Sequence, residues 1–169
     1  MTMLLTLILL TVMVLGGLAL ARMSEIGTLA NGNAAYREAA MQASEVGINT
    51  AYQAVRAVTN EELNAGSWYW ALTQAQDANG LPNVTWSSAP EVVVGKYSVR
   101  YVVERACQGA LPVTDALRQC LNKTISVGST ARPDAERLDP PAAKQFRITV
   151  RVTGPKDTQT WVQSLVTRG

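Results

Sequence analysis

Side chains that commonly perform catalysis are scarce in this sequence of 169 residues. It contains no histidine, so the commonest general base and the commonest transition-metal ligand are both missing. The serines of the run Ser126-Val127-Gly128-Ser129 therefore have no histidine to activate them as nucleophiles. We expect a protein that is not an enzyme and that uses no cofactor.

Four acidic residues of the C-terminal half could in principle supply ligands to a hard cation: Asp115, Asp134, Glu136 and Asp139. They lack the alternating oxygen ligands and the required glycine of a calcium loop. Solvated surface charge is the preferred interpretation, and no metal site is expected. A formal net charge of +2 without a basic stripe also gives no reason to expect nucleic acid as a partner.

The two cysteines, Cys107 and Cys120, lie in the polar half of the chain and form no Cys-x-x-Cys motif. A single disulfide fits this spacing best. Closing a loop of roughly 15 residues would stabilise the fold by about 3 kcal/mol, in a compartment that is oxidising. The alternative is a pair of unrelated buried thiols in a cytosolic domain.

The N-terminal segment has a composition of its own, because no charged side chain occurs from Met1 to Ala21. In a helix, about 21 residues reach about 32 Å, close to the thickness of the hydrocarbon core of a bilayer. We therefore predict a membrane-spanning segment over residues 1–21. Since Ala19-Leu20-Ala21 resembles a signal-peptidase site, a cleaved signal peptide remains open.

Helical character continues beyond Arg22, because no proline follows until Pro82 and residues 33–58 are rich in helix formers. Apolar residues recur there at helical spacing. We predict an amphipathic second half of the helix, residues 22–58, that packs on a sheet through Ile48, Tyr52 and Val55.

Glycines interrupt the predicted helix at positions 16, 17, 27 and 32. Small residues let neighbouring helices approach closely in or near a membrane. A stretch that can lose its helical structure is the alternative interpretation. Residues 59–62 then resemble the end of a helix followed by the cap of a new one.

Residues 59–169 have the pattern of a small globular head domain. Aromatic residues in the run Ser67-Trp68-Tyr69-Trp70 are expected to plug the edge of its core, with a binding patch as the alternative. Alternating apolar residues predict antiparallel strands over 97–104 and 146–153, followed by a returning strand over 158–166. A short strand near 124–127 and an exposed loop over 132–144 complete the prediction of an α+β fold.

Three runs in the first third of the chain resemble a known family: Leu15–Arg22 (LGGLALAR), Gly27–Asn33 (GTLANGN) and Arg37–Gly47 (REAAMQASEVG). They resemble the opening of PilX-type minor pilins of the type IV pilus. In that family an apolar segment leads to a Gly-Asn pair and then to a helix with an Arg-x-x-Ala-x-x-Ala-x-Glu pattern. The remainder of the chain is similar only in its layout.

The resemblance implies a type IV pilin-like fold and a subunit of a priming complex at the pilus tip. The implied partners are other minor pilins, the major pilin, a tip adhesin, the inner membrane and the prepilin peptidase, whose product would begin at Met1. Most pilins have a glutamate at the fifth mature position, where this chain has Leu5, which favours a minor pilin. The residues assigned to the membrane and to bundle contacts are Met1, Leu5, Leu10, Leu15, Gly16, Gly17 and Ala21.

Two other interpretations stay open. A tip pseudopilin of type II secretion would have the same physical features, and only its partners would distinguish it. A secreted binding domain with a cleaved signal would begin near Arg22 and would be soluble.

Overall fold

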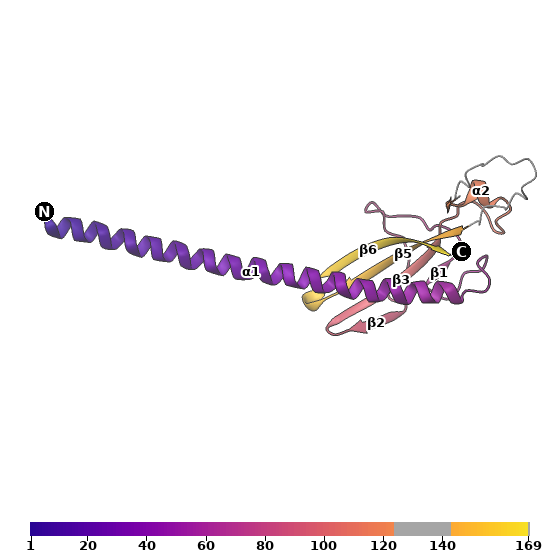
Figure 1. Cartoon of the computed structure of the whole chain (residues 1–169), viewed down its shortest axis with the longest axis horizontal. Coiled ribbons are helices and arrows are strands. Elements are labelled where there is room, and N and C mark those ends of the chain that lie inside the picture. Colours follow the sequence, from indigo (N-terminus) through magenta and orange to yellow (C-terminus); the bar gives the residue numbers. More distant parts are fainter. Residues whose placement is uncertain (124–142, 169) are drawn as a thin grey trace, which may run out of the picture. The chain divides into compact units, whose positions relative to one another are not determined.

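The computed structural model describes residues 1–123 and 143–168. One long helix, α1 (Thr2–Ala57), precedes a six-stranded sheet, so the chain has the expected α+β fold (Figure 1). The remaining elements are, in order, β1 (Tyr69–Trp70), β2 (Glu91–Val94), β3 (Tyr97–Arg105), α2 (Ala116–Gln119), β4 (Asn122–Lys123), β5 (Ala143–Thr153), the 3-10 turn η1 (Pro155–Asp157) and β6 (Gln159–Arg168). Two compact units divide the chain, Met1–Ala39 and Ala40–Gly169.

The sheet is built around β3 and β5, which pair antiparallel from Ser98↔Thr153 to Arg105↔Phe146. The β5–β6 hairpin continues it on one side, and β2 pairs with β3 on the other. The short strand β1 also pairs with β3, and that pairing is parallel. The sheet is therefore mixed rather than purely antiparallel, because two residues of the aromatic run after α1 pair with β3 in the same direction as β3.

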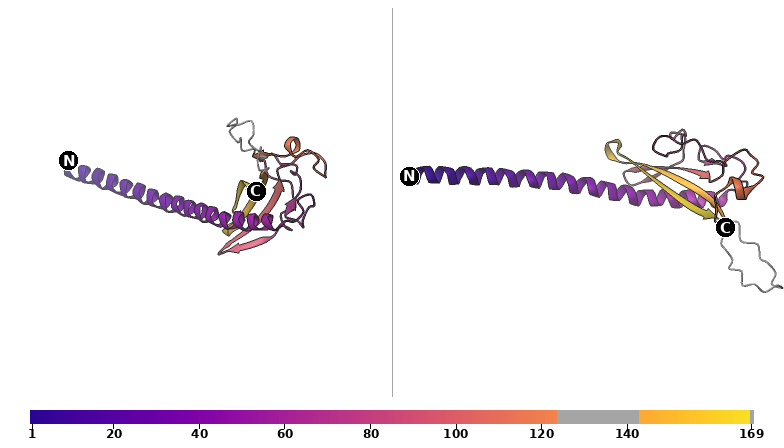
Figure 2. Two further views of the ribbon diagram at one scale, coloured as in Figure 1. Left: turned by 45° about the vertical axis from the view of Figure 1, so that its right-hand side comes forward. Right: turned by 90° about the horizontal axis from the view of Figure 1, so that it is seen from above.

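The core of the second unit lies between the last turns of α1 and one face of the sheet (Figure 2). Alternation along β5 places every second residue on this face, and all four are fully buried: Phe146, Ile148, Val150 and Val152. From β3, Val99 and Val103 are fully buried and Tyr101 is 7% exposed. The alternating pattern in the sequence thus predicted the buried face of both strands.

The chain after α1 differs from the prediction of a second helix. Residues 58–64 contain turns and no helix, and the Asn60 Oδ1 accepts a hydrogen bond from the backbone N–H of Glu62 at 3.0 Å. Asparagine here stabilises a turn rather than a helix N-terminus, since side chains of this type satisfy either arrangement. The cap prediction was wrong.

Two further predictions concern the segment before β5. The strand expected near 124–127 and most of the loop expected over 132–144 lie outside the described residues. At the end of that loop, Ala143 and Lys144 already belong to β5, where they pair with β4. The loop prediction therefore extended two residues too far.

Candidate membrane and assembly site

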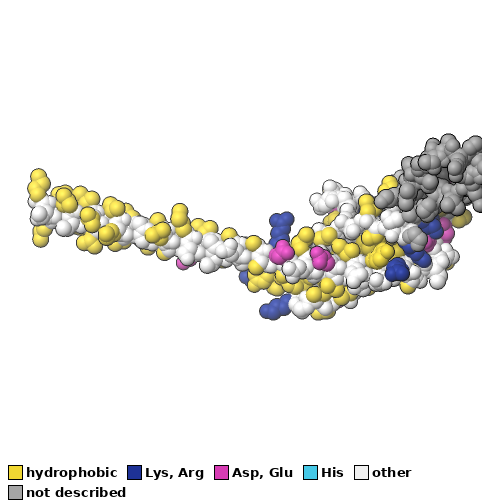
Figure 3. Space-filling model, viewed as in Figure 1, with side chains coloured by type: hydrophobic (Ala, Val, Ile, Leu, Met, Phe, Trp, Pro, Cys, Tyr) yellow, Lys and Arg dark blue, Asp and Glu magenta, His cyan; other side chains and the backbone are white. Residues whose placement is uncertain are grey.

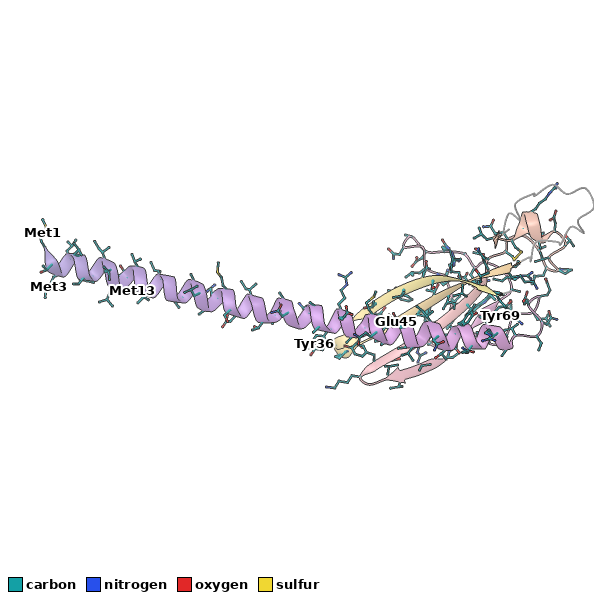
Figure 4. The ribbon with its side chains drawn as sticks, viewed as in Figure 1. Met1, Met3, Met13, Tyr36, Glu45 and Tyr69 are labelled. Carbon is teal, nitrogen blue, oxygen red and sulfur yellow. A yellow bond between two sulfur atoms is a disulfide. The ribbon has the colours of Figure 1, made fainter. Side chains whose placement is uncertain are left out.

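The first unit consists of the N-terminal part of α1, and its apolar side chains are exposed. Every large hydrophobic residue from Met1 to Leu20 is at least 53% exposed. Apolar side chains cover this part of α1 in Figure 3, and Met1, Met3 and Met13 project away from the helix in Figure 4. The residues assigned from the sequence all lie on this exposed surface: Met1, Leu5, Leu10, Leu15, Gly16, Gly17 and Ala21.

Two threonine hydroxyls within this segment donate hydrogen bonds inside the helix itself. The Thr6 hydroxyl donates to the carbonyl of Met3 at 3.0 Å, and the Thr11 hydroxyl donates to that of Ile8 at 2.8 Å. A Cβ added at Gly16 or Gly17 would have no atom within 4 Å. Among the described residues, α1 is the one helix long and apolar enough to cross a membrane, with a mean hydropathy of 2.6 in its most apolar window. By length and composition, this segment is able to serve as a membrane anchor or as a signal sequence.

In the second unit, α1 approaches the sheet through small residues. Ala43, Gly47 and Ala51 are spaced by four, lie on one face of the helix and are buried. Val55 is fully buried in the core, and Ile48 and Tyr52 are partly buried against it. All three residues predicted to pack on the sheet therefore lie in or against the core. Gly47, a position that was not predicted, lies between Ala43 and Ala51 on the buried face of the helix.

The C-terminus of α1 is fixed by the last described residue of the chain. The guanidinium of Arg168 in β6 donates from one nitrogen to the carbonyls of Val55 and Val58, at 3.0 and 2.9 Å. Carbonyls at the end of a helix have no partner within it, and a cation there also interacts favourably with the helix dipole. Arg168 thereby ties the edge strand β6 to the end of α1.

Charged residues just after α1 extend this connection. Glu61 lies 2.6 Å from the Nζ of Lys144 and 3.5 Å from Arg168. Arg105, which is 4% exposed, donates to Glu62 at 2.7 Å. This hydrogen bond and one from the backbone N–H of Val113 hold the pKa of Glu62 below its ordinary value.

Tyr69 closes the core beside this cluster. Its ring is fully buried and lies 6.4 Å from that of Phe146, and its hydroxyl donates to the carbonyl of Glu61 at 2.9 Å. Burial, with the nearby charge of Glu61, raises the pKa of Tyr69 to about 12. Trp68 is partly buried against the same core, so two of the three aromatic residues of the run, Trp68 and Tyr69, fill the edge of the core as predicted.

A buried ion pair lies on the face of the sheet away from α1. The carboxylate of Glu104 is fully buried, accepts a hydrogen bond from the Nε of Arg147 at 2.9 Å and lies 2.8 Å from a terminal nitrogen of the same guanidinium. It also accepts from the backbone N–H of Gln74 at 2.6 Å. Glu104 thus fixes the connecting segment to the outer face of the sheet.

The disulfide predicted from the spacing of the cysteines is present. Cys107 and Cys120 are joined at an S–S distance of 2.06 Å, and no free cysteine remains. The bridge closes the segment that carries α2. It borders a hollow of about 630 Å³ that Gln74, Gln108 and Arg118 help to line. No group of three or more potential metal ligands occurs among the residues that the structure describes.

Some of these positions could not be identified in advance. The spacing of four residues that Gly47 shares with Ala43 and Ala51 was a signal in the sequence that Gly47 lies on the same face of the helix. Arg168 and Glu104 carried no such signal, since their partners lie at least 30 residues away along the chain.

Comparison with known proteins assigns no family. The chain matches no family model, and no curated protein and no solved structure shows significant similarity to it. A functional proposal therefore has to be based on the long N-terminal helix, the small mixed sheet and the disulfide.

Proposed function

We propose that the chain is a minor pilin that joins other minor pilins in a priming complex at the tip of a type IV pilus. The observation that carries this proposal is the composition of α1. Its first 21 residues are apolar and exposed, whereas its last turns are covered by the sheet. A pilin needs both properties in one helix, because the apolar half lies first in the membrane and then in the filament.

A structural role accounts for the chain without invoking catalysis. In this proposal the exposed apolar side chains of residues 1–21 pack against the corresponding helices of other subunits by van der Waals contact. The head domain, with its disulfide, faces the oxidising periplasm before assembly. Leu5, in place of the usual glutamate, suits a subunit that starts a filament, because it cannot offer a carboxylate to the amine of a neighbouring subunit.

Processing of the N-terminus tests the proposal. The chain would be recovered from membranes of cells with and without prepilin peptidase, and its N-terminal sequence and mass determined. We expect a mature N-terminus at the start of the apolar segment, and we expect its formation to depend on the peptidase. A start near Arg22, with the protein in the soluble fraction, would overturn the proposal in favour of a secreted domain with a cleaved signal.

The choice between a pilus and type II secretion requires a second experiment. A photo-crosslinking amino acid at Leu10 would capture the subunits that pack against the apolar helix. Cross-links to pilins support the proposal, whereas cross-links to pseudopilins assign the chain to the tip of a secretion system.

A further inference from the structure

A group of two tryptophans and two arginines occupies the outer face of the sheet, away from α1. Register places Arg100 of β3 beside Arg151 of β5, and Arg151 beside Trp161 of β6. Trp86, from the segment that connects β1 to β2, completes the group. Its ring lies 4.8 Å from that of Trp161, with the two planes at 81°.

The guanidinium of Arg151 stacks on both rings. Its Cζ lies 5.4 Å from the centroid of Trp86 and 5.8 Å from that of Trp161. Such contacts stabilise a cation through the electron-rich faces of the rings, but they accept none of its N–H groups. They leave the hydrogen-bonding capacity of the guanidinium unused.

The two arginines differ in their partners. Arg100 forms an ion pair with Glu91 at 3.0 Å and also donates to the carbonyls of Trp86 and Ser87. Within residues 1–123 and 143–168, Arg151 donates to no acceptor, and its Nε is buried without one. Burial and the charge of Arg100 also lower the pKa of Arg151, because both oppose its positive charge. A partly buried cation without an anion is unfavourable, and binding an anion would relieve this cost.

We propose that Arg151, framed by Trp86 and Trp161, binds a carboxylate presented by an acidic segment of a partner protein. A guanidinium recognises a carboxylate through two parallel hydrogen bonds, and the surrounding rings exclude water from such a pair. Tryptophan and arginine are also the residue types that dominate the energy of protein–protein contacts. The site rests on side chains of the head domain and does not depend on the proposed function.

The charge distribution favours an acidic protein segment over a nucleic acid. Polyanions gain affinity from several cations along their backbone. Here a single guanidinium lacks an anion, since Glu91 already neutralises Arg100. A single carboxylate, bound between the rings of Trp86 and Trp161, would match the single planar guanidinium of Arg151.

Fluorescence anisotropy with labelled peptides tests the site on the full chain in detergent micelles. Hexaglutamate serves as the probe and hexaglutamine as its uncharged control, so the first comparison needs no variant. Arg151→Gln would then be compared with Arg118→Gln, which removes an arginine whose side chain is 88% exposed. A melting curve for each variant establishes that it is folded.

We expect hexaglutamate to bind more tightly than hexaglutamine, and Arg151→Gln to weaken its binding by about tenfold or more. Arg118→Gln should leave the affinity unchanged. Equal binding of the two peptides, or an equal loss in both variants, would overturn the proposal. Binding of oligothymidylate that exceeds that of hexaglutamate and depends on Arg151 would replace the acidic protein partner with nucleic acid.

Discussion

Gly47 of α1 lies so close to Val99 of β3 that a Cβ at position 47 would be 2.5 Å from the Cγ1 of Val99. The same Cβ would be 2.9 Å from the Cγ1 of Val150 in β5. Real Cβ atoms essentially never come this close to another atom. The helix therefore contacts the two central strands through its backbone, and only glycine fits there without displacing the valines.

Alanine at this position should destabilise the head domain. Overpacking a core costs about 1–3 kcal/mol, and the better helix propensity of alanine returns about 1 kcal/mol. For Gly47→Ala we expect a net loss of about 1 kcal/mol in the free energy of unfolding. Urea unfolding in micelles, followed by the fluorescence of the four tryptophans, all of which lie in the head domain, measures it.

The control for this substitution lies in the same helix. A Cβ at Gly32 would meet nothing within 4 Å. Gly32→Ala should leave the unfolding midpoint of the head domain unchanged. An equal loss of unfolding free energy in Gly32→Ala and Gly47→Ala would show that the loss comes from helix composition and not from contact with Val99.

Glu104 should be far more important to stability than Glu91, although each pairs with one arginine. The carboxylate of Glu104 is fully buried, and Glu104→Gln would leave the guanidinium of Arg147 without its anion, at a cost of about 3 kcal/mol. The side chain of Glu91 is 41% exposed, so Glu91→Gln should cost less than about 1 kcal/mol. The same urea measurement compares them, and similar losses would contradict a structural role for the buried pair.

Acid should remove the stabilisation that Glu62 provides. Because hydrogen bonds from Arg105 and from the backbone of Val113 hold the folded-state pKa of Glu62 below 4.5, the ionised carboxylate stabilises the fold fully above the pKa of the unfolded chain. That stabilisation is lost as the pH falls through the lower, folded-state pKa. The difference in urea midpoint between the wild type and Glu62→Gln should therefore be present at neutral pH and narrow below about pH 4.5.

Glu45→Gln is the control for this pH dependence, because Glu45 is exposed on α1 and belongs to the same unit. The urea midpoint of Glu45→Gln should differ little from that of the wild type at every pH. A Glu62→Gln difference that stays constant on acidification would contradict the role given to Arg105.

Loss of the disulfide should destabilise the chain through the unfolded state. Cys107 and Cys120 are separated by 13 residues, and a loop of this size is worth about 3 kcal/mol in the chain-entropy model. We expect the variant with both cysteines replaced by serine to lose about this amount. Comparing it with the wild type under reducing and oxidising conditions provides the control, since only the wild type should respond to the reductant.

Local pattern was sufficient to predict the main elements of the fold. Alternation predicted the buried faces of β3 and β5, and helix formers without proline predicted α1. Both signals depend on neighbours within a few residues along the chain. The two cysteines, 13 residues apart, were the most widely separated pair of residues that the sequence predicted correctly. For the contact of α1 with the sheet, the sequence predicted the helix residues but not their individual partners.

The specific partners of residues in distant segments were not predicted. The parallel pairing of β1, the capping of α1 by Arg168 and the burial of Glu104 each depend on a segment that lies far away in the sequence. The Trp86–Trp161 contact also joins distant segments, and the residues next to each tryptophan in the sequence do not indicate that the two rings meet. Turn chemistry after α1 was also misinterpreted, since asparagine stabilises turns and helix caps alike.

A charge within the apolar segment should separate membrane anchoring from secretion. Leu10→Asp places a carboxylate at the middle of the predicted span, which costs about 2.5–3.5 kcal/mol for a helix in the membrane. Alkaline extraction of membranes should then release more of the variant than of the wild type. Leu29→Asp, at an equally exposed leucine beyond Arg22, should be retained like the wild type. If the wild-type chain is itself released and Leu10→Asp only lowers its export, residues 1–21 act as a signal sequence rather than as an anchor.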